Sequence, residues 1–345
     1  MDVASFVCAG DVMINRPEPG TMLRHVASYF KAADAAYVNF EGPACDVGKP
    51  HPDMSAVGIH IRSTPKAPAA LKEAGINVVS LANNHALDYG SAGLMQTIVA
   101  LEKLKIGYAG AGPDLASARC PAMLTVKGIK VAILSYTSVC VASFAAKADK
   151  PGVAMIRIDT SYEANLRLLM QPGSPMVTRT HANADDVAML KEDIRAAKSK
   201  ADVVIVAWHW GVSERWGRLA EYQRKLAHLA IDEGADVILG HHAHMLHGME
   251  FYKGRPIFYS LGNFAFDMEH PYFRSESAIV RFQLAKSGVS DVQIIPVAIN
   301  GNHEPEPVTA LDAITKMGWL LEQHSEGLNS RFLPRPGYLE MVPLS

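Results

Sequence analysis

The chain has 345 residues, 49% of them apolar, and a formal net charge of -2 at neutral pH. That apolar content is enough for a substantial buried core, in one large α/β domain or two modest ones. The near-neutral charge argues against the broad basic face that nucleic-acid binding normally needs, so we expect no nucleic-acid partner. A local basic pocket for an anionic substrate remains compatible with it.

The first two-thirds of the chain alternate between apolar runs typical of buried strands and patterns typical of helices. This alternation predicts a sheet covered by helices. The predicted strands are Val3–Ala9, Ala36–Phe40, Val78–Leu81, Val131–Tyr136, Val203–Trp208 and Val237–Leu239. The predicted helices are Met22–Ala33, Ala67–Ala74, Leu94–Leu104, Ala188–Lys198 and Leu219–Asp232.

Residues 140–185 lack clear periodicity and contain two Pro-Gly steps. A loop of that length in a compact domain is usually functional or disordered, and we interpret it as a candidate substrate lid. After Gly248 short strands separated by turns take over, and we expect them to form a second sheet packed on the first. These strands are Met249–Tyr252, Pro256–Tyr259, Ala278–Leu284 and Val292–Ala298, followed by a predicted helix at Leu311–Gln323.

Two features bear on where the chain works. The densest apolar run, Val203 to Val212, is about half as long as a spanning helix, which predicts no membrane span. The N-terminus leads directly into a strand-like run without a basic leader region, and a cytoplasmic location is the resulting expectation. The four cysteines are scattered, without a CxxC pair, and are interpreted as structural thiols.

Polar clusters follow five of the apolar strands at the point where each strand ends. Ligand sites of open α/β sheets form outside the carboxyl ends of the strands. Carboxylate, amide and imidazole groups are ligands that divalent first-row metals accept, so the sequence predicts a metal site at this edge. The clusters are Gly10-Asp11, Asn39-Phe-Glu41-Gly42, Asn83-Asn84-His85, His209-Trp-Gly211 and His241-His242-Ala-His244.

Each cluster also has a structural explanation when taken singly. Asp11 is compatible with a turn or helix cap, Asn84 with a residue that satisfies loop backbone groups, and His209 with a buried core histidine. These explanations do not account for the shared position at the same end of successive strands. The common position therefore favours the metal site.

The run from His241 to His244 places three imidazoles in four positions, which is costly to bury without metal or charge partners. His242 and His244 point the same way if the segment is extended, so both are predicted metal ligands. His241 is predicted to point elsewhere and to support the ligands, or to be an alternative ligand if the backbone turns sharply. Asp88 is either a helix-start acid or the partner of an imidazole.

Two charged residues are candidates for substrate binding. Arg16 follows the first strand and is suited either to an anionic substrate group or to the solvated surface. Glu214, five residues beyond His209, is suited either to a base or substrate contact near the metal or to an exposed loop. The residues alone leave both alternatives open.

Several segments resemble the CapA family, which is associated with poly-γ-glutamate capsule synthesis. The resemblance spans about residues 3–267 and implies a four-layer αββα sandwich of the metallophosphatase type, as in calcineurin-like phosphoesterases. It also implies one CapA-like domain over residues 1–300, with 140–185 as a lid or insertion loop and 301–345 as an extension packed on it. The matching segments are Phe6–Asp11, Val38–Pro43, Leu81–Gly90, Trp208–Gly211, Gly240–His244 and Tyr259–Phe264.

The resemblance also implies roles for individual residues. Glu41 takes the place of a metal-bridging aspartate, His85 matches a general-acid histidine, and Asp11 and His209 join it as catalytic residues. The implied ligands of one or two divalent ions (Mn, Zn or Fe) are Asp11, Glu41, Asn84, His209, His242 and His244. The first motif of the calcineurin-like metallophosphoesterases has a histidine where this chain has Met13, so we expect a second ion to bind weakly or not at all.

Three functions fit this set of residues. The first is a metal-dependent hydrolase that uses an activated water to cleave an amide, γ-glutamyl or peptide-like bond in a small or peptide-like substrate. The capsule association and Met13 favour it. The second is phosphoester hydrolysis, which rests on analogy of fold alone. The third is non-hydrolytic, either as a metal-assisted epimerase or lyase or as an accessory factor in poly-γ-glutamate assembly.

Overall fold

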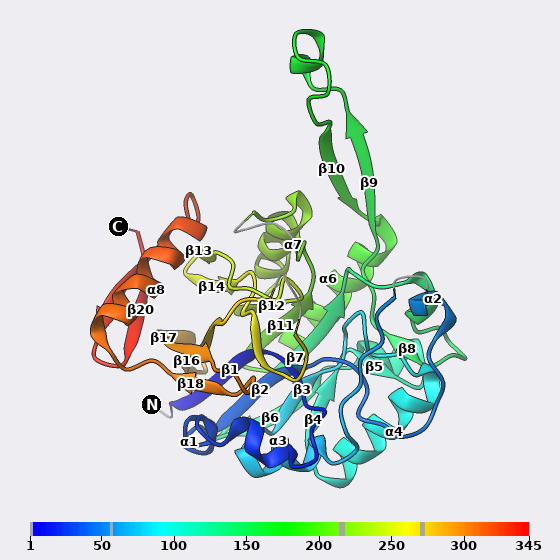
Figure 1. Ribbon diagram of the computed structural model, residues 1–345, viewed down its shortest axis with the longest axis vertical. Coiled ribbons are helices and arrows are strands. Elements are labelled where there is room, and N and C mark those ends of the chain that lie inside the picture. The colour runs from blue at the N-terminus through cyan, green and yellow to red at the C-terminus, as the bar shows by residue number, and fades with distance from the viewer. Residues whose placement is uncertain (1–2, 56–57, 214–217, 270–272, 345) are drawn as a thin grey trace.

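Two β-sheets lie face to face, and helices cover the outer face of each (Figure 1). The computed structural model describes residues 3–55, 58–213, 218–269 and 273–344. Alternation along the strands creates three apolar layers. In β1 (Ala4–Met13), for example, Phe6 and Cys8 face the other sheet, whereas Val7 and Ala9 face the helices. The expected four-layer αββα sandwich is confirmed.

The first sheet combines parallel strands from the start of the chain with antiparallel strands from its end. Its order is β19-β20-β17-β16-β1-β2-β3-β4, with β15 beside β1 and β18 beside β17. The early strands are β1, β2 (Ala35–Phe40), β3 (Val78–Ser80) and β4 (Gly107–Ala109). The late strands are β15 (Asn263–Phe266), β16 (Glu276–Ala285), β17 (Gly288–Ile299), β18 (Pro305–Pro307), β19 (Ser330–Arg335) and β20 (Tyr338–Pro343).

The second sheet has the order β13-β14-β12-β11-β7-β6. Its central strands β7, β11 and β12 are parallel, and their carboxyl ends lie at one edge. The strands are β6 (Ala122–Val126), β7 (Ile129–Thr137), β11 (Val203–His209), β12 (Val237–His241), β13 (Met249–Tyr252) and β14 (Arg255–Phe258). A separate short pair joins β5 (Ala111–Gly112) to β8 (Gly152–Val153).

The helices divide between the two outer faces. The first sheet is covered by α1 (Ala27–Lys31), α3 (Ala67–Ala74) and α4 (Gly90–Lys103). The second is covered by α6 (Ala184–Lys198) and α7 (Glu221–Asp232), while α8 (Leu311–His324) packs near β19. Shorter helices are α2 (Pro52–Ser55), α5 (Leu115–Arg119) and the 3-10 turns Pro19–Leu23, Ala142–Phe144 and Leu166–Leu169. None of the helices that the structure describes is long and apolar enough to cross a membrane.

The prediction that the late strands form a sheet of their own is wrong. β1 has a second edge that pairs antiparallel with β16, and β12 has one that pairs parallel with β14. The late strands therefore complete both sheets, since each open edge carries unpaired backbone groups that need partners. The predicted helix Met22–Ala33 is also divided, into a 3-10 turn and α1.

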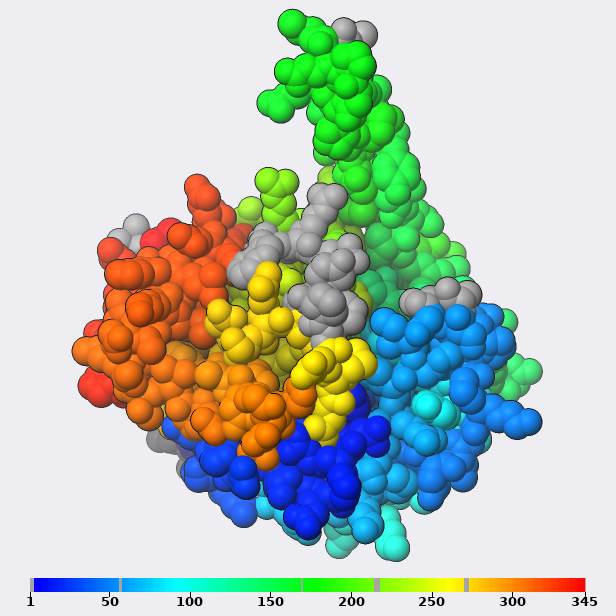
Figure 2. All heavy atoms as spheres, viewed as in Figure 1, coloured from blue at the N-terminus to red at the C-terminus, as the bar shows by residue number. Residues whose placement is uncertain are grey.

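Part of the segment 140–185 forms a hairpin that stands away from the body (Figures 1 and 2). Its strands, β9 (Ile158–Glu163) and β10 (Val177–Ala182), pair antiparallel, and most of their residues are exposed. The segment is thus more regular than the expected loop. Its function as a lid stays a prediction, as does the division of the chain at residue 300.

His247 is a buried histidine whose ring nitrogens have no hydrogen-bond partner among the described residues. Burial, and secondarily His324, lowers its pKa to about 4. As the pH falls, His247 is therefore protonated at a higher pH in the unfolded chain, where its pKa is the ordinary value of about 6.5, than in the folded chain. We expect this histidine to cost the metal-free protein roughly 3 kcal/mol of stability as the pH falls from about 6.5 to about 4.

Replacing His247 with Leu tests this expectation. The variant should show a shallower loss of unfolding free energy over the same pH range, measured by urea denaturation of the metal-free protein. The stability above pH 7 is the internal reference. Parallel pH curves for the two chains would contradict the assignment to His247.

Candidate metal centre

The polar clusters of both sheets meet at the carboxyl ends of their strands. Asp11 lies in β1 and Glu41 directly after β2, while His209 ends β11. One ligand atom from each of these three residues lies within 4.8 Å of the others, and all three side chains are buried. Strands that are distant in sequence therefore bring carboxylate and imidazole groups to one point.

Asp11 is held in place by contacts with both sheets. Its Oδ1 accepts a hydrogen bond from Asn39 Nδ2 at 2.9 Å and lies 3.0 Å from His241 Nδ1, and its Oδ2 accepts from the backbone N–H of His242 at 3.2 Å. Burial raises the pKa of Asp11, but the histidine contacts outweigh this and hold it below its ordinary value. The carboxylate is thus ionised and oriented.

Close backbone packing also fixes Asp11. A Cβ atom on Gly10 would lie 1.9 Å from the carbonyl oxygen of Gly262, the same oxygen that accepts from Asp11 N–H at 2.9 Å. Only glycine permits this approach of β1 to the segment before β15. The register then places Asn263 opposite Asp11.

Glu41 is fully buried, and neither carboxylate oxygen has a hydrogen-bond partner in the part of the chain that the structure describes. Its Oε1 lies 3.7 Å from His209 Nε2, 3.8 Å from His244 Nε2 and 4.0 Å from His85 Nε2. Burial, followed by the charges of Asp11 and Asp88, raises its pKa well above the ordinary value.

A buried carboxyl group without partners is costly, and a cation among these imidazoles would remove that cost. The orphaned Oε1 of Glu41, together with the three imidazole nitrogens within 4.0 Å of it, fits the donor set of a divalent metal ion.

His209 connects the two sheets within the site. Its Nε2 lies 2.7 Å from Asn84 Oδ1 and 3.2 Å from His242 Nδ1, and its Nδ1 lies 3.3 Å from Asn39 Nδ2. Burial and neighbouring histidines lower the pKa of His209 well below its ordinary value and that of His242 to about 3. Both rings are therefore neutral near pH 7, the form in which imidazole binds metal.

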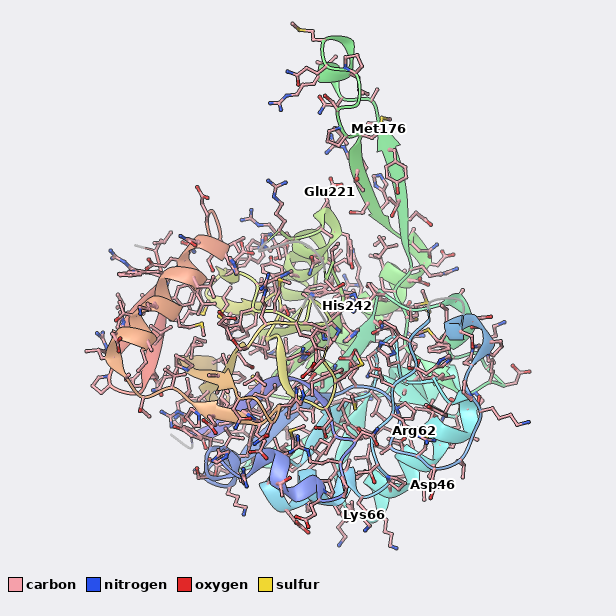
Figure 3. All side chains as sticks on the ribbon, in the orientation of Figure 1. Asp46, Arg62, Lys66, Met176, Glu221 and His242 are labelled. Atoms are coloured by element: carbon pink, nitrogen blue, oxygen red, sulfur yellow. The ribbon has the colours of Figure 1, made fainter. Side chains whose placement is uncertain are left out.

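His242 and His244 both line a cleft of about 140 Å³ beside Glu41, and Figure 3 shows His242 in the middle of the molecule. The expectation that they lie on an extended segment is wrong, because their φ angles are +91° and +55°. The backbone turns at both residues, so strand alternation does not explain why the rings share a cleft. Such positive φ values are strained for non-glycine residues and persist only where the surroundings impose them.

His241 and Asp88 lie behind the groups that face the cleft. His241 Nε2 lies 3.0 Å from the hydroxyl of Tyr37, on the side away from Asp11. Asp88 Oδ2 lies 2.7 Å from His85 Nδ1 and accepts from the backbone N–H of Ile61 at 2.7 Å. Of the two alternatives for Asp88, the structure thus shows the partner of an imidazole.

Met13 occupies the position where the first motif of calcineurin-like metallophosphoesterases has a histidine. Its side chain is buried in an apolar cluster with Ile61 and Phe266, at the wall of the cleft. This position contributes packing and no strong metal ligand. The weak binding of a second ion stays a prediction.

The two predicted substrate contacts have different outcomes. Arg16 is largely buried, with Nη2 2.6 Å from Asp267 Oδ1 and Nη1 3.1 Å from Glu304 Oε1. These ion pairs join the end of β1 to the segment after β15 and to the turn before β18. A substrate contact by Arg16 stays a prediction. Glu214 lies outside the described residues.

Sequence reasoning assigned no role to Asn263 or Asn39. Asn263 Oδ1 lies 2.8 Å from His244 Nδ1, which directs Nε2 of that ring toward Glu41. The sequence did carry a signal, since Asn263 lies in the specific string Tyr259–Phe264 and Asn39 begins the cluster that contains Glu41. Their contacts depend on strand register, which the sequence does not reveal.

Replacing Asn263 with Ala is expected to weaken metal affinity by about 10- to 100-fold, because the ring of His244 loses the acceptor that orients it. Titration calorimetry of the metal-free protein with Mn²⁺ or Zn²⁺ measures the effect. Asn263→Asp keeps an acceptor for His244 Nδ1 and should retain more of the affinity. Equal affinities for the parent and Ala chains would contradict the role of Asn263.

The four-layer sandwich brings acid, amide and imidazole groups together at its strand ends, and the chain is thus an α/β protein with a candidate metal centre. The chain belongs to the bacterial capsule synthesis protein PGA_cap family, whose family model matches residues 5–268.

Two relatives illustrate the family. The capsule biosynthesis protein CapA of Bacillus anthracis is 33% identical over 92% of this chain and 73% of its own length. The PGA biosynthesis protein CapA of Bacillus subtilis is 31% identical over 98% of this chain and 82% of its own length. Among solved structures, calcineurin-like phosphoesterase YfkN from Bacillus subtilis aligns with a TM-score of 0.44 and 13% identity, over 93% of this chain and 98% of that one.

Proposed function

We propose that this protein is a metal-dependent hydrolase that cleaves an amide, γ-glutamyl or peptide-like bond. The observation that carries the proposal is Glu41, a fully buried carboxyl group without hydrogen-bond partners in the described chain, surrounded by the Nε2 atoms of His85, His209 and His244. The residues that would hold the ion are Asp11, Glu41, Asn84, His209, His242 and His244.

A divalent ion, when bound, would polarise the reacting group and lower the pKa of water. The chain's own contribution to proton transfer would come from His85. Asp88 accepts a hydrogen bond from Nδ1–H of this ring, so in the imidazolium form the second N–H, at Nε2, would face the cleft and donate its proton to the leaving amine, which leaves the ring neutral. Asp11 and His209 would act as ligands, and Asp11 is itself oriented by Asn39 and His241.

The cleft favours an uncharged reacting group over a phosphate. Its walls are largely apolar, and none of the described residues that line it is Lys or Arg. Phosphate groups are usually recognised by such cations. The relatives' names support the same choice, since they place those proteins in the biosynthesis of capsule and PGA. Apolar wall residues include Met54, Ile59, Ile61, Phe266, Met268 and Phe273.

A panel assay tests the proposal. The purified protein, stripped of metal and reloaded with Mn²⁺ or Zn²⁺, is compared on γ-glutamyl amides, small peptides and aryl phosphates, with His209→Ala as the control. Metal-dependent amine release that is lost in the control supports the proposal. Phosphate release alone would replace it with a phosphoesterase, and release of neither product would favour an accessory, epimerase or lyase function.

A further inference from the structure

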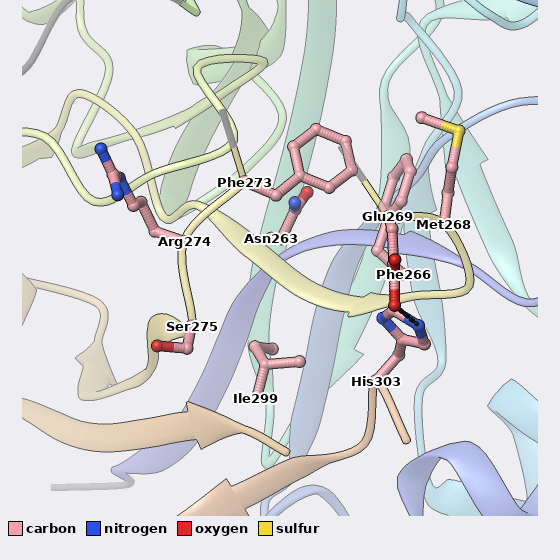
Figure 4. Close-up of a pocket in the computed structure, with 9 residues that line it drawn as sticks. All are labelled: Asn263, Phe266, Met268, Glu269, Phe273, Arg274, Ser275, Ile299 and His303. Carbon is pink, nitrogen blue, oxygen red and sulfur yellow. Dashed lines mark ion pairs between the residues drawn. The ribbon is translucent and has the colours of Figure 1, made fainter. Parts of the chain in front are cut away.

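A second, larger cavity of about 580 Å³ adjoins the metal cleft, and we call it the side chamber (Figure 4). Both spaces are bounded by Phe266, Met268 and Phe273. Asn263 lines the side chamber, and its Oδ1 contacts His244, which lines the cleft. A group bound in the side chamber would thus lie one side chain away from the candidate metal centre.

The boundary between the two spaces is aromatic. The rings of Phe266 and Phe273 meet edge to face at 5.4 Å, and each also packs against His244, at 5.5 and 4.7 Å. Ile299 adds an apolar side chain to the chamber. Such a surface suits the methylene groups of an extended chain that passes from the cleft into the chamber.

The charges of the side chamber lie at its two ends. Figure 4 shows Arg274 on one side and the pair Glu269 and His303 on the other, with 4.0 Å between Glu269 Oε1 and His303 Nε2. Among the described residues that line the cleft and the chamber, Arg274 is the only Arg or Lys. A guanidinium has five N–H donors, enough to serve a protein neighbour and a ligand carboxylate together.

We propose that the side chamber binds the substrate unit next to the reacting bond, and that Arg274 recognises a carboxylate on that unit. The ligand class is a peptide-like chain with carboxylate side groups. This inference rests on the proposed hydrolase function, because it places the reacting bond at the metal cleft and the acidic unit beyond the aromatic boundary. The uncharged reacting bond would then lie in the largely apolar metal cleft, and the charged neighbouring unit would lie near Arg274 in the side chamber.

Binding of two probes tests the inference. One is a fluorescein-labelled γ-linked glutamate oligomer, and the other is the same oligomer with its α-carboxylates converted to carboxamides. Fluorescence anisotropy gives the Kd of each for the full chain, with and without Mn²⁺. We expect the parent chain to prefer the acid oligomer. Arg274→Met should weaken that binding by about 10- to 100-fold, since hydrogen bonds to charged groups contribute about that much.

Three comparisons decide the result. The carboxamide oligomer should bind Arg274→Met and the parent chain alike, and Arg274→Lys should recover part of the acid affinity. Arg331→Met, which changes an exposed residue of β19, should change neither affinity. Unchanged acid binding by Arg274→Met, or equal loss for both oligomers, would overturn the role of Arg274. If Arg274→Met does not fold, a parent chain that binds both oligomers equally would overturn it as well.

Amine release from the acid oligomer is measured in parallel. Binding that depends on Arg274 without metal-dependent amine release would reject the hydrolase and keep the side chamber as a carboxylate site. Metal-dependent amine release together with acid binding that Arg274→Met does not change would support the hydrolase and reject the side chamber as a carboxylate site.

Discussion

Replacing Glu41 with Gln is expected to abolish the stabilisation that Mn²⁺ or Zn²⁺ gives the protein, while the metal-free chain stays at least as stable as the parent. The metal-free parent contains a buried carboxyl group near Asp11 and Asp88 without hydrogen-bond partners among the described residues, and Gln keeps its shape but cannot ionise there. The metal-loaded parent gains about 2.7 kcal/mol when the ion is present at 100 times its Kd. The variant loses a central ligand and should gain almost none of this.

Thermal unfolding at several metal concentrations, with metal content by elemental analysis, measures both effects. Glu322→Gln, on the exposed face of α8, is the matched control and should respond to metal as the parent does. A Glu41→Gln chain that retains stoichiometric metal would disprove the ligand assignment. A metal-free variant much less stable than the parent would show that Glu41 has an unrecognised structural partner.

Replacing His85 with Asn is expected to slow amide hydrolysis by about 10²- to 10⁴-fold, because the leaving amine loses its proton donor. Metal content should change little, since His85 Nε2 lies at the edge of the donor set, 4.0 Å from Glu41 Oε1. Asp88→Asn should give a smaller loss, because the ring keeps its donor atom but loses the carboxylate at Nδ1.

The choice of leaving group separates this role from a structural one. A substrate with an acidic leaving group needs little protonation, so the variant should lose much less activity on an activated anilide than on an alkyl amide. His181→Asn, on exposed β10, is the control. Equal losses on both substrates, or loss of bound metal, would count against His85 as the proton donor.

Much of the site's position could be predicted from the sequence because apolar runs mark strands and polar residues mark their ends. Asp11, Glu41 and His209 each follow or end such a run, and parallel strands bring their carboxyl ends together. The four-layer arrangement followed from the resemblance and is confirmed. The local pattern of apolar and polar residues predicted the sheet edge at which the site lies, and the family resemblance predicted the four-layer fold.

The remaining features depend on long-range pairing, which local patterns do not encode. Asn263 contacts His244 only because β15 pairs in parallel with β1. This pairing sets Asn263 beside Asp11, although the two residues are 252 positions apart in the sequence. The short string before β15 gives no sign of that partner. The positive φ angles of His242 and His244 are likewise imposed by tertiary contacts, since neither residue type requires them.

The pairing of β1 with β16 has a practical consequence for anyone who shortens this protein. The family-matched region ends at residue 268, but the neighbour of Ala4–Ala9 is β16, which begins at Glu276. A fragment that ends at residue 268 would leave one edge of β1 without its partner strand. The unpaired backbone groups of that edge could then pair with a strand of another molecule. Such a fragment should precipitate or self-associate, and any inactivity it showed would say nothing about its metal ligands.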